Sequence, residues 1–236
     1  MTRLERMIEA LPLTWPDWLA LLFLVAVWAG YQWHADYSAT GRPRVGRQME
    51  RYMREWLARM VERDNRMVDV NVLRNLTRSS QFFASTTMFI LGALVALMGY
   101  AEQAASVVAQ LPFAEQVSRR LWEIKVLVLL LIFVYGFFKF TWSIRQFGFC
   151  SILVGAVRKP PAQASEYDGD IDRIAVILGF ANRNFNQGLR AYYFGVAALS
   201  WFLHSALMIA VTLGVLYVLH EREFRSQTLK VLGIQR

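Results

Sequence analysis

The chain alternates between long apolar stretches and strongly charged ones. Apolar residues gather in four blocks of roughly 20 residues, and charged residues lie mainly between the blocks. A helix needs about 20 residues to cross the roughly 30 Å of hydrocarbon in a bilayer. The pattern therefore predicts four transmembrane helices, over residues 17–37, 80–101, 121–147 and 191–219.

The uncharged run of the first block is short, and a secretory signal peptide is the competing interpretation because Arg3 and Arg6 precede it. Cleavage requires small residues at the end of the apolar run, where Trp28, Tyr31 and Trp33 stand instead. We therefore expect this segment to stay attached and to span the membrane.

The two long connections carry helical patterns of their own. Between residues 42 and 79, apolar residues recur every three or four positions, which predicts an amphipathic helix that either lies among the lipid headgroups or packs against a neighbouring helix. In the connection 150–190, Asp170 is placed to cap a second amphipathic helix. The predicted fold class is all-α: residues 1–236 form a single membrane domain, a helical bundle with amphipathic cytoplasmic extensions.

Composition supports the membrane class, because 56% of the residues are hydrophobic and only 19% are charged. The net charge of +8 and the isoelectric point near 9.9 are also seen in nucleic-acid-binding proteins. Arginine placed on the cytoplasmic side of a membrane explains the same excess, so we expect no binding to nucleic acid. Cys150 is the only cysteine, which excludes an intramolecular disulfide and a cysteine-cluster metal site.

The orientation follows from the distribution of lysine and arginine. Sixteen of them lie around the two long connections and eight on the opposite side of the predicted spans. Positive charge is retained in the cytoplasm, so the long connections are predicted to be cytoplasmic and both termini external, in a bacterial inner membrane. A fifth span would invert the helices that follow it.

Polar residues recur at three- and four-residue spacing where the blocks approach the cytoplasmic side, so each set shares one helix face. Polar groups at membrane depth are costly unless they are paired or wetted, which predicts that these faces point into the bundle or line a water-filled cavity. The candidate residues for a polar pathway or a lipid-headgroup site are Asp36, Arg74, Arg78, Ser85, Lys139, Ser143, Asn186, Arg190 and His204.

Two interpretations of this set stay open. In the first, the cations form an entrance that admits an anion or binds an anionic lipid headgroup. In the second, the polar groups join helices to one another, with arginines pairing to Asp36, Asp64 or Asp69 and capping helix ends. His204 is expected to form an interhelical hydrogen bond rather than to bind a metal.

Three segments of the chain are similar to one known family. They are LRNLTRSSQFFASTTMFILG at 73–92, FKFTWSIRQFGF at 138–149 and NRNFNQGLRAYYFGVAALSWF at 182–202. These segments resemble the signature blocks of the domain-of-unknown-function family 599, membrane proteins of bacteria and plants with several helices and no established activity. The resemblance covers about residues 18–226; it implies a membrane architecture and supplies no catalytic residues.

The sequence leaves three classes of function. The preferred one is a homo-oligomeric ion channel or transporter for anions, with copies meeting at small residues four apart, Ala26 with Gly30 or Gly92 with Ala96. The second is a structural or regulatory membrane subunit that binds anionic lipid headgroups or a partner protein.

The third class is an unrecognised membrane enzyme. No phosphate-binding loop, nucleophile motif or zinc motif is present in the sequence, and Glu123 beside Lys125 is expected to be an interfacial ion pair. We therefore expect no catalytic residues, no cofactor and no metal.

Overall fold

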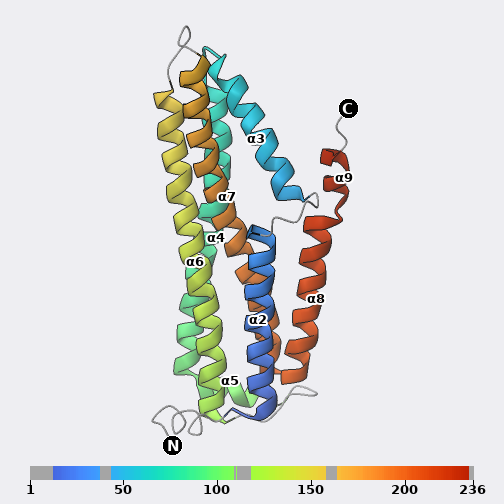
Figure 1. The fold of residues 1–236 in the computed structure, drawn as a ribbon. Coiled ribbons are helices and arrows are strands. Elements are labelled where there is room, and N and C mark those ends of the chain that lie inside the picture. Colours follow the sequence, from blue (N-terminus) through green and yellow to red (C-terminus); the bar gives the residue numbers. More distant parts are fainter. Residues whose placement is uncertain (1–12, 38–43, 109, 111–117, 158–163, 234–236) are drawn as a thin grey trace, which may run out of the picture. The chain divides into compact units, whose positions relative to one another are not determined.

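The computed structural model describes residues 13–37, 44–108, 110, 118–157 and 164–233, and within them every regular element is helical. This confirms the predicted all-α class (Figure 1). The helices are α2 (Trp15–Tyr37), α3 (Val45–Val61), α4 (Met67–Gly99), α5 (Ala101–Val108), α6 (Arg119–Ala156), α7 (Ala164–Leu199), the 3-10 helix η1 (Ser200–Phe202), α8 (Ser205–Phe224) and α9 (Gln227–Gly233).

Four helices in the described residues are long and apolar enough to cross a membrane: Trp15–Tyr37, Met67–Gly99, Arg119–Ala156 and Ser205–Leu232. The chain is therefore a multi-pass membrane protein. Three of its helices are longer than a bilayer requires, since α4, α6 and α7 have 33, 38 and 36 residues. At 1.5 Å per residue each is about 50 Å or longer, so each must extend into water on one side.

The fourth predicted span differs from the structure. The sequence predicted one helix over 191–219, but α7 ends at Leu199 and α8 begins at Ser205. The chain turns back between the two helices (Figure 1). Local polar groups stabilise the turn: the Ser200 hydroxyl donates to the Ala197 carbonyl at 2.7 Å, and His204 Nδ1 accepts from the Ala206 backbone N–H at 3.0 Å.

This reversal changes the predicted topology. The Gly46 backbone N–H donates to Glu223 Oε1 at 3.2 Å, so the end of α8 lies beside the start of α3. The predicted topology placed the connection 42–79 and the chain beyond the fourth block on opposite sides of the membrane. That part of the prediction is wrong, because an apolar block read as one crossing contains a reversal.

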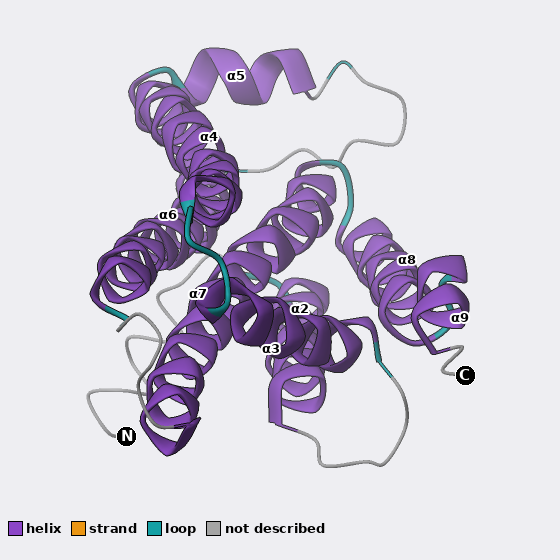
Figure 2. Ribbon diagram, turned by 90° about the horizontal axis from the view of Figure 1, so that it is seen from above, coloured by secondary structure: helices purple, strands orange, loops and turns teal. Residues whose placement is uncertain are grey.

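The chain divides into two compact units. Unit 1 contains α2, residues 87–99 of α4, α5, residues 119–136 of α6, residues 190–199 of α7, η1 and residues 205–217 of α8. Its α5 runs across the end of α4 instead of continuing it (Figure 2). Aromatic rings fill its interior: Trp28 stacks on Phe194 with ring centroids 5.6 Å apart and meets Tyr135 edge-on at 5.3 Å.

Unit 2 contains α3, residues 67–86 of α4, residues 137–156 of α6, residues 164–189 of α7, residues 218–224 of α8 and α9. The apolar face of α3 enters its core through Leu57, Met60 and Val61. Of the two interpretations of the amphipathic helix, the structure therefore confirms packing against neighbouring helices. The other buried core residues are Leu73, Phe147, Cys150, Val154, Val157, Ile174, Leu178 and Ala181.

The small residues expected to bring copies together face outward. Ala26, Gly30, Gly92 and Ala96 are all exposed. A Cβ atom added to Gly30 or to Gly92 meets nothing within 4 Å. These pairs are therefore not needed for close packing within one protomer, and they present open faces to lipid or to another chain.

A close approach of α6 and α7 in unit 2 depends on Gly188. A Cβ atom at this position would lie 2.6 Å from Phe140 Cε1. Phe140 is fully buried, and the rings of Phe83 and Phe185 lie against it with centroids 5.4 and 5.8 Å away. The ring therefore has little room to move away from an added methyl group.

We expect Gly188→Ala to lower stability by about 1–3 kcal/mol through overpacking, despite the better helix propensity of alanine. The thermal unfolding midpoint in detergent measures the effect. Gly179→Ala on the same helix is the matched control, because a Cβ there meets nothing within 4 Å. The control should be neutral or stabilising; an equal loss in both variants would contradict the packing explanation.

Candidate functional site

Two of the candidate residues form a buried ion pair in unit 1. Arg190 Nη1 donates to Asp36 Oδ1 at 2.7 Å, and the two side chains are only 9% and 4% exposed. The Arg190 guanidinium also lies 5.5 Å from the centre of the Tyr31 ring. The pair joins α2 to α7 across 154 positions of sequence. Arg190, one of the candidate cations, is therefore neutralised by Asp36, one of the three acids predicted to pair with the arginines.

Further polar groups on α2 and α6 lie in the same unit. Gln32 Nε2 donates to the Tyr135 hydroxyl at 2.7 Å. Trp28 Nε1 and Gln32 Oε1 are buried and have no hydrogen-bond partner among the described residues. Trp28 and Gln32 stand one turn apart on α2. The sequence did not indicate Tyr135, whose neighbours in the sequence are apolar.

A second buried polar cluster surrounds Trp201, where α7 ends. Asp17 Oδ1 accepts from Trp201 Nε1 at 2.8 Å and from the Ser205 hydroxyl at 2.6 Å, while Thr14 donates to Asp17 Oδ2. Lys125 Nζ donates to the Trp201 carbonyl at 2.8 Å and lies 5.2 Å from the Trp201 ring centre. Asp17 and Lys125 are each only 1% exposed. At the helix break, backbone and side-chain groups lack the hydrogen bonds of a regular helix. The cluster gives hydrogen-bond partners to the Trp201 carbonyl and to Ser205.

Sequence reasoning missed this cluster. Asp17 was not among the candidate residues, and Lys125 was expected to pair with Glu123. In the structure Glu123 instead accepts from Arg119 Nε at 2.9 Å. Residues two apart on a helix, such as Glu123 and Lys125, do not face each other, whereas residues four apart, such as Arg119 and Glu123, do. This spacing could have been read from the sequence.

The two clusters are separated by an apolar interior. Asp17 and Asp36 stand 19 residues apart on α2, which is about 28 Å along the helix. This is close to the thickness of a bilayer's hydrocarbon. Three described hydroxyl groups between them have hydrogen-bond partners within the unit: Thr87 and Tyr192 share a hydrogen bond at 2.9 Å, and the Thr212 hydroxyl donates to the Met208 carbonyl at 2.7 Å. The described side chains of unit 1 thus place charge at the two ends and apolar packing between.

The remaining candidate residues do not form one site. In unit 2, Ser143 is buried; it shares a hydrogen bond with Ser80 at 3.2 Å and donates to the Ala181 carbonyl at 2.9 Å. Lys139 Nζ donates to Asn184 Oδ1 at 3.4 Å. The exposed members are Arg74, Arg78, Ser85, Asn186 and His204.

His204 does not lie in the middle of a span as predicted. It stands directly before α8, where its ring nitrogen accepts a backbone N–H. The side chain therefore caps a helix start. The residue falls in the turn between α7 and α8, and the expected interhelical hydrogen bond stays a prediction.

One of the acids predicted to pair with the arginines is engaged elsewhere. Asp69 is fully buried in unit 2, and its Oδ1 accepts from Trp56 Nε1 at 2.7 Å and from Arg63 at 2.6 Å. Its Oδ2 has no partner among the described residues. Asp69 therefore serves the junction of α3 and α4.

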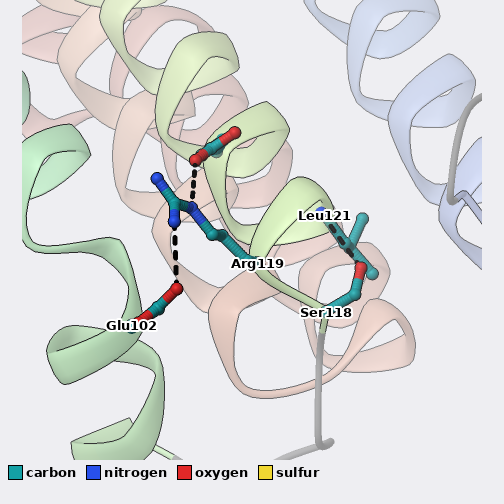
Figure 3. A network of polar contacts seen from close by, with 5 residues as sticks. Glu102, Ser118, Arg119 and Leu121 are labelled. Carbon is teal, nitrogen blue, oxygen red and sulfur yellow. Dashed lines mark hydrogen bonds and ion pairs between the residues drawn. The ribbon is translucent and has the colours of Figure 1, made fainter.

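A surface network joins α5 to the start of α6 in unit 1 (Figure 3). Arg119 donates to Glu102 and to Glu123, each at 2.9 Å, and the Ser118 hydroxyl accepts from the Leu121 backbone N–H at 3.3 Å. Arg119 and Glu102 are more than 60% exposed, so their ion pair contributes little stability. The network links α5 to the start of α6.

Comparisons with known proteins identify the family of the chain. Among the described residues, no group of three or more histidine, cysteine, aspartate or glutamate side chains is placed to hold a metal ion. No curated protein and no solved structure matches the chain. The model of one family, described as protein of unknown function, DUF599, matches residues 19–228, nearly the whole chain. The chain therefore belongs to the DUF599 family.

Proposed function

We propose that this protein is a structural or regulatory membrane subunit that anchors a helical unit at the membrane surface and conducts no ions. The observation that carries the proposal is the buried pair of Arg190 with Asp36. An anion entrance needs a cation that is open to the ion. The charge of Arg190 is instead neutralised by the Asp36 carboxylate of the same chain.

The interior of unit 1 supports the same function. Charged side chains that are buried at its two ends are bonded to partners, and the layer between them is mainly apolar, with its threonine hydroxyls bonded within the unit. An ion that crossed this layer would lose its water without gaining fixed polar ligands. The arrangement instead resists movement of the helices, because sliding one helix would strand a buried charge.

A homo-oligomeric anion channel is the second candidate. One observation favours it: Arg74, Arg78 and Ser85 point outward from α4, so a polar path would have to run between copies of the chain. We assign no catalytic role. Glu123, which was expected to pair with Lys125, is bonded to Arg119.

We propose that unit 2 faces the cytoplasm of a bacterial cell. With the end of α8 beside α3, 20 lysines and arginines belong to the side of the long connections. Only Arg3, Arg6, Arg119 and Arg120 belong to the other side. The remaining two of the 26 cationic residues, Lys125 and Lys139, lie within α6. This division is more one-sided than the one predicted from the sequence, and it favours an external N-terminal end with α8 ending inside. That orientation requires five crossings, so the C-terminal part of α7 crosses the bilayer together with α2, α4, α6 and α8.

Ion flux in liposomes tests the function. With purified protein reconstituted, we expect the fluxes of Cl⁻, K⁺ and H⁺, measured separately, to equal those of protein-free liposomes. A matched ionophore control establishes that each ion is detected. Flux that rises with the protein-to-lipid ratio would contradict the proposal. Loss of such flux in Arg74→Gln would support the channel between copies.

Cysteine labelling in intact cells tests the topology. In a Cys150→Ala background, Ala58→Cys on α3 and Arg225→Cys after α8 should be protected from a membrane-impermeant maleimide until the cells are permeabilised. Gln103→Cys on α5, an exposed position, should react in intact cells. External labelling at Ala58→Cys would overturn the orientation. Labelling of Ala58→Cys and Arg225→Cys from opposite sides would overturn the reversal between α7 and α8.

A further inference from the structure

Two arginines on α4 carry charges that the described part of unit 2 does not neutralise. Arg74 and Arg78 are exposed, and neither side chain has an ion pair or a hydrogen bond within the part of the chain that the structure describes. Three other arginines of the unit are engaged: Arg54 pairs with a carboxylate of α7, Arg63 pairs with Asp69, and Arg66 donates to two carbonyls at the end of α6. The two α4 cations differ from these three arginines.

The spacing of Arg74 and Arg78 brings two like charges together, which is unfavourable for α4 without a ligand. Arg74 and Arg78 stand four residues apart, so both guanidinium groups project from the same face of α4. Like charges in this arrangement destabilise a helix unless an anion lies between them. The arrangement thus favours an anionic ligand that the chain itself does not provide.

The position of the pair along α4 indicates which anion. From Ser79 to Tyr100 the sequence contains no charged residue, so Arg78 is the last charge before the apolar run that enters the membrane. Arginine at such a boundary lies at headgroup depth. Phe82, one turn further along the same side, is 65% exposed and offers an apolar surface toward the acyl chains.

We infer that Arg74 and Arg78 bind the phosphate of an anionic phospholipid, with Phe82 contacting its acyl chain. The planar guanidinium fork matches the geometry of phosphate oxygens. A free phosphate would gain nothing from Phe82. A second copy related by a two-fold axis along this face would set arginines against arginines. The inference rests on the proposed function only in that α4 must be embedded in a bilayer.

Lipid titration of the detergent-solubilised protein tests the site. We expect phosphatidylglycerol to bind at least about tenfold more tightly than phosphatidylcholine, given two arginines that each contribute about fivefold. Arg74→Gln with Arg78→Gln should remove most of this preference, and Phe82→Ala should weaken phosphatidylglycerol without changing the response to inorganic phosphate. Unchanged thermal midpoints would show that the exposed substitutions leave the fold intact.

The matched control is Arg47→Gln with Arg51→Gln, which removes the same charge at the same spacing from α3. This control should keep the preference. Equal binding of the two lipids by the unsubstituted protein, an equal loss in the control, or full competition by inorganic phosphate would overturn the inference. Lipid binding is measured independently of ion flux. Ion flux together with a retained preference for phosphatidylglycerol would overturn the proposed function alone. Absence of flux together with no lipid preference would overturn this inference alone.

Discussion

A charge buried at membrane depth must be neutralised where it stands, and the pair of Arg190 with Asp36 meets this requirement in unit 1. Arginine keeps its proton under all ordinary conditions, so the guanidinium cannot avoid the cost by losing its charge. Its carboxylate partner must therefore remain within hydrogen-bond distance. This constraint fixes the position of α2 relative to the end of α7, and it removes the cation from any role that needs contact with a passing ion.

The same constraint operates where the chain breaks its helix between α7 and α8. A break leaves backbone groups without helical partners, which is tolerated in a membrane protein only where other groups supply hydrogen bonds. Lys125 donates to the carbonyl of Trp201, and Asp17 accepts from the Trp201 ring and from Ser205. Asp17 of α2 and Lys125 of α6 thus stabilise the reversal between α7 and α8. The result is a unit with satisfied polar clusters at its ends and apolar packing between them.

The sequence predicted the helical class, three of the spans and the amphipathic character of α3, because these follow from hydrophobic periodicity within one segment. It also offered Asp36 as one of three possible partners of the arginines, and the structure pairs Asp36 with Arg190. It missed the turn at residues 200–204, since this turn depends on Ser200 and His204 bonding to nearby backbone within an apolar block. Asp17 and Lys125 were missed because their partner, Trp201, is 184 and 76 positions away. Pairing at such a distance depends on tertiary packing, which local patterns do not contain.

The central claim is that Arg190 and Asp36 act as one neutral unit that holds helices together. Its most direct test is a double-mutant cycle in detergent, comparing the stability of Asp36→Leu, Arg190→Met and the double variant. Each single substitution strands a buried charge and should cost about 3–5 kcal/mol, whereas the double variant removes both charges and should cost far less than the sum. Single substitutions without effect, or losses that simply add in the double variant, would contradict the account.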